Sequence, residues 1–317
     1  MRIERWSAER ARAALAGPDL DRSLGSAHGI AAVVVELHDD PGTDIATALT
    51  RLPVVAIGCG TSPGEGWDIA TSDPSGAIEG ITAAPLAAVV TAQTLRMTAA
   101  LALPDALTIE SLAYATLQSG PEFRTWLEGR GRRVRNDTAP RIDVADTGDE
   151  VVVTLSRPRL LNLLDARMRD ELVDAFRAIG AGDPRPVRLT GAGPAFCAGG
   201  DPAEFGTASD PATAHLTRSS ANVAPWLAAI GDRTTASVHG ACVGAGVELA
   251  AFCHHVVAAD DTRFRLPETR MGLMPGAGGT VSVPARIGRQ RTLEWLLSGY
   301  ELDAATALDW GLVDHVV

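Results

Sequence analysis

The sequence contains no lysine, since all 28 of its basic residues are arginine. This absence excludes two kinds of chemistry that depend on a lysine amine, the Schiff-base mechanism and the phosphate-binding loop of nucleotide hydrolases. Acidic residues number 39 and give the chain a net charge of −11. A protein of this sign has no general electrostatic attraction for nucleic acid or for an anionic membrane surface. We therefore expect neither partner, and an anionic ligand must be held by local groups.

Cysteine is also scarce. The four cysteines include no CxxC pair and stand at Cys59, Cys197, Cys242 and Cys253. In a chain of 317 residues this usage suits a reducing compartment better than a disulfide framework or a zinc site. We expect a cytoplasmic protein with small buried cysteines and no metal site.

Long uninterrupted apolar runs are missing as well. Charges occur throughout the first 17 residues, and the apolar stretch 85–104 is interrupted by Gln93 and Arg96. These patterns predict neither a signal peptide nor a membrane span. The hydrophobic content of 46% is nevertheless enough for a substantial buried core.

The distribution of apolar residues predicts an α/β protein. From Ile30 onward, runs rich in β-branched residues alternate with amphipathic stretches, as in sheets joined by crossover helices. One segment departs from this order, because 86–101 and 108–129 are predicted to be consecutive helices. A polar, basic stretch, GRGRRVRNDTAPR, follows them. It predicts a boundary between an N-terminal region, 1–140, and a second region, 141–317.

The two regions contain a weak internal repeat. The segments IAAVVVEL, DIATALTRL and VVAIGCG resemble, in the same order, DEVVVTLS, MRDELVDAFRAIG and VRLTGAG. Each set predicts a strand, a helix, a strand and a glycine turn. After its glycine turn the first set has no acidic helix like that of the second, which favours a degenerate duplicate without its own active site. The alternative is that any two strand–helix–strand units share this much similarity.

The first motif that indicates chemistry is GAGPAFCAGGDPAEF, at Gly191–Phe205. It predicts a strand, a glycine-rich turn, and a helix that begins at Asp201 with Pro202 in its first position. The small residues allow a ligand to approach the backbone closely. Free amides at such a turn suit a developing oxyanion or a phosphate.

The second motif, SVHGACVGAGVEL, predicts a strand, a loop with three glycines, and a helix that begins near Ala245. The Ala245 amide would then be an unsatisfied donor at the positive end of the helix dipole. Glu248 follows three residues later, on the same face as that amide. An isolated glutamate at this position is more simply explained as a residue that stabilises the dipole.

The third motif, FRLPETRMGLMPGAGGT, places Glu268 among apolar residues, which should raise the pKa of its carboxyl. A raised pKa suits a general acid or base. The run Pro275–Gly279 is predicted to form a loop that leads into another helix.

Taken together, the segments RPRLLNLLD, AFCAGGD, HGACVGAGVEL, LPETRMGLMPGAGGT and GLVDHVV resemble the crotonase superfamily. Within it they are most similar to the enoyl-CoA hydratase/isomerase family. The resemblance covers about 141–317 and implies a crotonase-like spiral of repeated ββα units. The N-terminal α/β segment then ends in helices that resemble the family's C-terminal tail.

The resemblance also implies roles for single residues. The amides of Gly200 and Ala245 match the family's oxyanion hole, although Ala245 stands where glycine is usual. Glu248 and Glu268 match the two glutamates that flank the reacting water, and the amide of Gly276 helps to orient it. The positions that match contacts to coenzyme A and substrate are Leu161, Ala198, Gly199, Asp201 and Gly244.

Two glutamates favour hydration of the 2,3 double bond of an enoyl-CoA thioester, because one carboxylate is enough for an isomerase. The alternatives are enoyl-CoA delta-isomerisation or other enolate chemistry on an acyl-CoA, and an acyl-CoA-binding subunit without catalysis. The resemblance implies no cofactor beyond the coenzyme A of the substrate. It also predicts a homo-oligomer, a trimer or a hexamer.

The sequence departs from the family at its end. Family members continue beyond the GLVD strand into helices that cover the coenzyme A site, whereas this sequence stops at Val317. The N-terminal helical segment, 86–133, resembles those helices. Our hypothesis is that it packs in their place, in its own chain or a neighbour's, with Phe123, Trp126 and Arg130–Arg133 near coenzyme A. The alternative is a helical cap with a basic linker.

Overall fold

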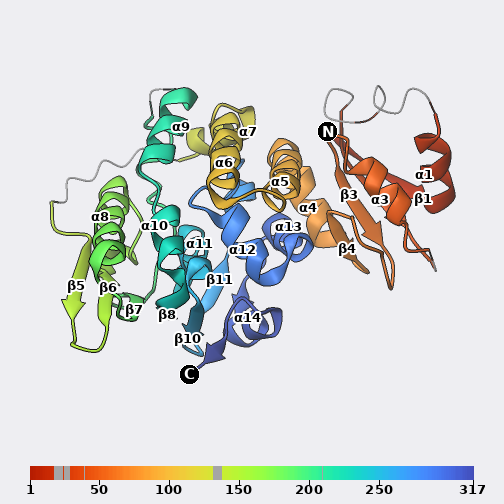
Figure 1. Ribbon diagram of the computed structural model, residues 1–317. Coiled ribbons are helices and arrows are strands. Elements are labelled where there is room, and N and C mark those ends of the chain that lie inside the picture. The colour runs from red at the N-terminus through yellow and green to blue at the C-terminus, as the bar shows by residue number, and fades with distance from the viewer. Residues whose placement is uncertain (18–23, 25–28, 39, 131–137, 209) are drawn as a thin grey trace.

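The computed structural model describes residues 1–17, 24, 29–38, 40–130, 138–208 and 210–317 (Figure 1). These residues form a mixed α/β structure in which an N-terminal sheet and a larger C-terminal sheet are separated by helices. Figure 1 shows the N-terminal sheet on one side of the molecule and the C-terminal sheet on the other, with α4, α5, α6 and α7 between them.

The N-terminal sheet is parallel, and its strands follow one another in chain order. They are β1 (Arg2–Ser7), β2 (Ile30–Glu36), β3 (Val55–Cys59) and β4 (Ile69–Thr71). Helices α1 (Ala8–Leu15) and α3 (Thr43–Leu49) connect them. Strand β2 is apolar on both faces, because Val33 and Val35 pack with Ile45 while Ala32 and Val34 belong to the main core. A continuous apolar run of this kind is typical of a strand covered on both sides.

The C-terminal part contains a six-stranded sheet and a three-stranded sheet. In spatial order the larger sheet consists of β13 (His315–Val316), β10 (His255–Ala258), β8 (Thr234–Val238), β7 (Val187–Gly191), β6 (Val151–Leu155) and β5 (Ile142–Asp146). Only the β5–β6 pairing is antiparallel within it. The smaller sheet consists of β12 (Leu302–Asp303), β11 (Arg263–Arg265) and β9 (Ala241–Val243).

Both predicted strand–helix–strand sets are present. The second consists of β6, α8 (Ala166–Gly182) and β7, and the first of β2, α3 and β3. Helix α8 begins where the Asp165 side chain accepts a hydrogen bond from the Met168 amide, a typical N-cap. It buries Leu172 and Phe176 against the sheet. The remaining helices of the C-terminal part are α9 (Pro211–Ser220), α10 (Ala224–Ala229), α11 (Ala245–Phe252), α12 (Gly279–Ile287), α13 (Arg289–Ser298) and α14 (Ala304–Trp310).

Four helices lead from the N-terminal sheet to the C-terminal part: α4 (Ser75–Ala83), α5 (Pro85–Thr98), α6 (Leu103–Gln118) and α7 (Pro121–Glu128). The prediction of one helix over 108–129 was wrong, because α6 ends at Gln118 and α7 begins at Pro121. Proline has no amide hydrogen and cannot continue a helix, so it starts a new one after the Gly120 cap. Within the described residues no single helix is long and apolar enough to span a membrane, and α4 and α5 pass that test only as a pair bent by 114°.

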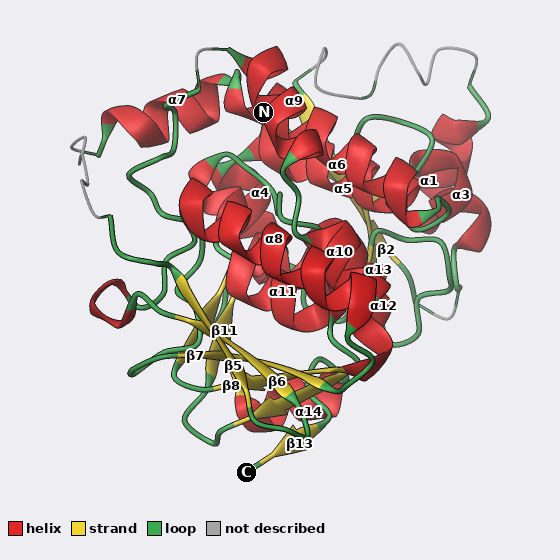
Figure 2. Ribbon diagram, turned by 60° about the vertical axis from the view of Figure 1, so that its left-hand side comes forward, coloured by secondary structure: helices red, strands yellow, loops and turns green. Residues whose placement is uncertain are grey.

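The N-terminal helices pack closely on the C-terminal part, as Figure 2 also shows for α4, α5 and α6. Helix α4 meets α13 so closely that a Cβ at Gly80 would lie 1.8 Å from the Leu297 carbonyl oxygen. The buried carboxylate of Asp68 forms ion pairs with Arg96 of α5 and Arg289 of α13. One hydrophobic core therefore contains residues from both sides of position 140.

Candidate active site

Two of the predicted glycine turns lie side by side. Cys197 and Cys242 form a parallel bridge in which the Val243 amide donates to the Cys197 carbonyl at 2.8 Å. A Cβ at Gly244 would consequently lie 3.8 Å from the Gly199 Cα. At Gly246 a Cβ would lie 2.7 Å from the Cys197 carbonyl oxygen, so only glycine fits there. The bridge thus brings the AGGD turn next to the turn that begins α11.

These turns present the two predicted oxyanion donors. Helix α11 begins at Ala245, as predicted, and its N-cap is Gly244 with φ 49°. Gly200 follows Gly199, which also has a positive φ of 97°. Within the described part of the chain, the amides of Gly200 and Ala245 donate to no other residue. Both amides are therefore available to an acceptor on a ligand. The Ala245 amide also lies at the N-terminus of α11, where the positive end of the helix dipole attracts negative charge.

The predicted helix at Asp201 is not present. Residues 202–206 form a turn, and the next helix, α9, begins at Pro211 after the Asp210 cap. The Asp201 carboxylate is buried and accepts from the Ala203 amide at 3.0 Å, which closes a short side-chain turn. It also forms an ion pair of 3.2 Å with Arg157. The Asp201 side chain thus occupies an N-cap position, but Gly206, with a positive φ of 75°, ends the turn before a helix forms.

The segment predicted to contact coenzyme A is fixed by residues that the sequence did not reveal. Leu161 has a left-handed backbone, and its carbonyl accepts from the Ala198 amide at 2.9 Å. The side chain of Asn162 is fully buried and donates to the carbonyls of Ala192 and Ala195. Among the arginines here, Arg157 is buried, whereas Arg159 is exposed. No pattern in the sequence distinguishes these two arginines, because burial depends on the neighbouring turn.

The two predicted catalytic glutamates lie on either side of the second turn. Glu248 is 2% exposed, and its Oε2 accepts from the amides of Ala277 and Gly279 at 2.7 and 2.8 Å. Glu268 begins the 3-10 turn Glu268–Met271, and its Oε1 would lie 2.6 Å from a Cβ at Gly244. Its Oε2 is buried without a hydrogen-bond partner in the described structure. A buried carboxyl oxygen without a partner is costly unless a ligand or water binds there.

A further buried glutamate, Glu110 of α6, was not predicted. Its Oε1 accepts from the Gly278 amide at 2.8 Å, and its Oε2 accepts from the amide and hydroxyl of Thr280 at 2.9 and 2.7 Å. The helix periodicity contained a signal, because Glu110 lies on the same buried face as Ala106 and Leu107. A charged residue on an apolar face requires partners, although the sequence does not say which.

These three carboxyls influence one another. Burial raises the pKa of Glu248 well above its usual range, and the charges of Glu110 and Glu268 raise it further. Burial raises the pKa of Glu268 to about 7. It also raises the pKa of Glu110, against the lowering effect of the Thr280 and Gly278 donors. Three buried carboxyls in one cluster do not all ionise at neutral pH, so the cluster retains protons.

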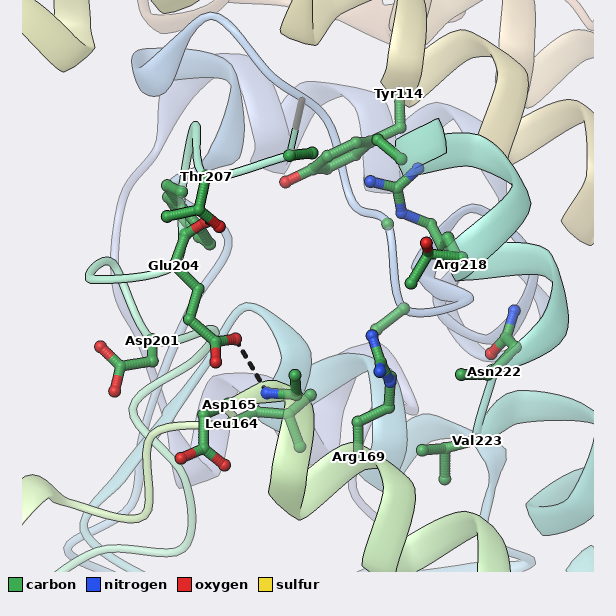
Figure 3. Close-up of a pocket in the computed structure, with 18 of the residues that line it drawn as sticks. Tyr114, Leu164, Asp165, Arg169, Asp201, Glu204, Thr207, Arg218, Asn222 and Val223 are labelled. Carbon is green, nitrogen blue, oxygen red and sulfur yellow. Dashed lines mark hydrogen bonds between the residues drawn. The ribbon is translucent and has the colours of Figure 1, made fainter. Parts of the chain in front are cut away.

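A cavity of about 420 Å³ lies next to the loop whose amides hold Glu248 (Figure 3). Gly276 and Ala277 of the loop 275–279 border it on one side, and Tyr114 and Gln118 of α6 line it from the N-terminal region. A Cβ at Gly276 would lie 2.5 Å from Tyr114 Cδ2, so the loop and α6 are in direct contact. The N-terminal region therefore forms part of the cavity wall.

Helix α7 contacts the same region in its own chain. The Trp126 ring lies 5.8 Å from that of Phe205, and a Cβ at Gly200 would lie 3.1 Å from the Phe205 ring. Arg130 stacks over Trp126 at 4.6 Å. The remainder of this basic stretch, residues 131–133, lies outside the described residues. The predicted proximity of these helices to coenzyme A remains a hypothesis, but they border the turn that carries Gly200.

The sequence matches the family model described as enoyl-CoA hydratase/isomerase over residues 149–317. The chain therefore belongs to the enoyl-CoA hydratase/isomerase family. The curated relatives include a probable enoyl-CoA hydratase of Mycobacterium bovis, 36% identical over 171 residues, which are 52% of this chain and 64% of the relative. The corresponding protein of Mycobacterium leprae is 34% identical over 171 residues, again 52% of this chain and 64% of the relative. The matched part thus spans less than two thirds of these relatives.

Solved structures give the same fold. An enoyl-CoA hydratase subunit from Geobacillus kaustophilus is 36% identical, with a TM-score of 0.52, and the match covers 56% of this chain and 68% of the other. An enoyl-CoA hydratase from Thermoplasma volcanium is 32% identical, with a TM-score of 0.52 and coverage of 56% and 72%. The C-terminal part therefore has the mixed α/β crotonase fold that the sequence predicted.

Proposed function

We propose that this protein is an enoyl-CoA hydratase, which adds water to the 2,3 double bond of an enoyl-CoA thioester. The observation that carries the proposal is the position of two glutamates, the buried Glu248 and the half-buried Glu268, next to the turns that present the free amides of Gly200 and Ala245. A putative enoyl-CoA hydratase from Thermobifida fusca, 29% identical with a TM-score of 0.50, was solved in complex with acetoacetyl-CoA. That relative supports a coenzyme A thioester as the ligand.

In the proposed reaction the thioester carbonyl accepts hydrogen bonds from Gly200 and Ala245. One glutamate carboxylate takes a proton from water as its oxygen bonds to Cβ, and the π electrons move to form an enolate. The two amides stabilise the negative charge on the enolate oxygen, and each such donor lowers the barrier by about 2.7–4 kcal/mol. The other glutamate, as the neutral acid, then delivers its proton to Cα, and the product is a 3-hydroxyacyl-CoA.

The protonation state of the cluster suits this chemistry. Addition of water requires one carboxylate and one carboxylic acid at the same time. Burial raises the pKa of both Glu248 and Glu268, and their mutual repulsion opposes the removal of the second proton. The pair therefore carries one proton near neutral pH, and this proton belongs to the pair and not to either residue alone.

The amide of Gly276 completes the proposed site. It donates to no other residue in the described structure and belongs to the turn whose neighbouring amides hold Glu248. We assign to it the orientation of the attacking water. The same turn is fixed from the other side by Glu110, so the water position depends on both regions of the chain.

Glu248→Gln and Glu268→Gln test the proposal with a short trans-2-enoyl-CoA. Glutamine keeps the shape and an acceptor oxygen but cannot exchange the proton, so each variant should lose about 10²- to 10⁴-fold in kcat. Wild-type rates in both variants would rule out this mechanism. Product identification with 2-enoyl and 3-enoyl substrates distinguishes hydration from isomerisation. Tight binding of coenzyme A esters with no turnover would favour a non-catalytic subunit.

A further inference from the structure

One arginine in the cavity has an unusual environment. Arg218 of α9 lines the cavity and stacks over the Tyr114 ring at 4.2 Å. Its guanidinium donates only to neutral groups of α6, which are Gln118 Oε1 at 3.1 Å, Ser111 Oγ at 3.4 Å and the Ser111 carbonyl at 3.5 Å. Among the described residues no carboxylate forms an ion pair with it.

This arrangement leaves a positive charge incompletely compensated. Burial lowers the pKa of Arg218, and the more distant charges of Glu110 and Glu248 offset this only in part. An arginine remains charged under such conditions and gains free energy when an anion replaces the lost water. A second guanidinium, that of Arg169, also faces the cavity from α8, on the same side as Arg218 (Figure 3). Its partner, Asp170, is 56% exposed, so this ion pair is weak.

The acidic residues of the cavity, Asp165, Asp201 and Glu204, lie on its other side in Figure 3, and each already has a partner. Asp165 forms ion pairs with Arg141 and Arg157, and Arg157 also pairs with Asp201. Glu204 accepts from the Ala166 amide at 2.8 Å. The cavity is therefore divided into an acidic side, whose carboxylates are engaged, and a basic side formed by Arg169 and Arg218.

The basic side is next to the loop that carries the proposed water-orienting residue. The Tyr114 ring contacts Gly276 on one side and the Arg218 guanidinium on the other. One aromatic ring therefore separates Arg218 from the loop that holds Glu248. The same cavity is lined by Gly276 and Ala277 and by Arg218, so it connects this loop with the guanidinium.

We propose that the cavity accepts an enoyl-CoA whose short acyl chain ends in a carboxylate, and that Arg218 binds this carboxylate. The inference rests on the proposed hydratase function and adds the class of substrate. The coenzyme A phosphates are another source of negative charge, but the long pantetheine arm separates them from the thioester. The carboxylate at the acyl end is the anion that fits a position next to the catalytic loop.

Two pairs of ligands test the proposal. Glutaconyl-CoA and trans-2-pentenoyl-CoA have five-carbon acyl chains and share coenzyme A, but only the first ends in a carboxylate. Their kcat/KM values measure turnover. Glutaryl-CoA and pentanoyl-CoA are the saturated counterparts, and calorimetric Kd values for them measure binding without turnover. A charge-assisted pair predicts a preference of roughly ten- to a hundredfold for the carboxylate in both measurements.

Arg218→Gln should reduce this preference at least tenfold, and Arg218→Lys should retain part of it because lysine keeps the charge. The matched control is Arg177→Gln, because Arg177 stacks over Trp226 at 4.5 Å in a similar way but does not line the cavity. This control should keep the wild-type preference.

The outcomes separate the two proposals. Hydration of pentenoyl-CoA without a preference for glutaconyl-CoA would overturn the carboxylate inference and leave the hydratase function intact. Hydration of neither substrate would count against the hydratase function, and the Kd ratio would still decide the role of Arg218. An equal loss of affinity for glutaryl-CoA, pentanoyl-CoA and free coenzyme A in Arg218→Gln would place the arginine at the coenzyme A phosphates and overturn the inference.

Discussion

Glu110 and Glu248 hold alternate amides of one turn. Glu248 accepts from Ala277 and Gly279, and Glu110 accepts from Gly278 and Thr280. One carboxylate comes from α6 in the N-terminal region and the other from α11 in the family core. The turn between them contains the proposed water-orienting residue and is therefore fixed from both sides by buried, charge-assisted hydrogen bonds.

Glu110→Gln should disturb this turn. A glutamine offers one acceptor oxygen to donors that now use two, so an amide or hydroxyl loses its partner, at a cost of about 1–3 kcal/mol of stability. Displacement of the turn should lower kcat on the order of tenfold to a hundredfold. The variant also removes a negative charge beside Glu248, so the acidic limb of the kcat/KM profile should move to lower pH.

The matched control for Glu110→Gln is Glu122→Gln. Glu122 also accepts from two amides, those of Leu86 and Ala87 at 2.7 and 2.9 Å, but it fixes the start of α5. This control should lower the melting temperature without shifting the pH profile. An unshifted profile for Glu110→Gln, together with reduced stability, would limit Glu110 to a structural role.

Ala245→Pro removes one proposed oxyanion donor. Proline has no amide hydrogen but is compatible with the first position of a helix, so α11 should still form. We expect kcat for a short enoyl-CoA to fall about 10²- to 10³-fold. Thr43→Pro is the control, because Thr43 also begins a helix after a glycine with positive φ and is exposed far from the site. Full activity in Ala245→Pro would show that this amide does not bind the thioester oxygen.

The raised pKa of Glu268 predicts a dependence of stability on pH. Its carboxyl has a pKa of about 7 in the folded state and about 4.3 in an unfolded chain. Between these values the folded state binds more protons, so the free energy of unfolding falls as pH rises from about 4 to about 7. Urea unfolding at a series of pH values should show a smaller fall for Glu268→Gln. An unchanged slope would show that Glu268 does not titrate in this range.

Asp68 joins the N-terminal sheet to the C-terminal part. It is fully buried and pairs with Arg96 and Arg289, and it accepts from the Ala56 amide at 2.8 Å. Asp68→Asn leaves two arginines without their anion, which should cost about 3–5 kcal/mol and lower the melting temperature. Asp44→Asn is the control, because the Asp44 ion pair with Arg12 is exposed and should contribute little. Equal melting temperatures for the two variants would contradict this role for Asp68.

Local patterns in the sequence were enough to predict several parts of the site. The glycines around Ala245 and the apolar residues after it predicted the start of α11, because a helix terminus depends on adjacent residues. The glycine turn of the first motif was predicted for the same reason, and the structure has it at Gly193–Pro194. The helix expected at Asp201 was wrong, because the chain forms only the turn 202–206, which Gly206 ends with a positive φ of 75°.

The sequence by itself determined the family, the alternation of strands and helices, and the two glutamates proposed as catalysts. Only the tertiary structure decided that Glu110 joins them and that Tyr114 and Arg218 line the cavity. These contacts connect residues more than a hundred positions apart. Hydrophobic periodicity indicates which face of α6 is buried, but the partners of a buried charge depend on which helix packs against it.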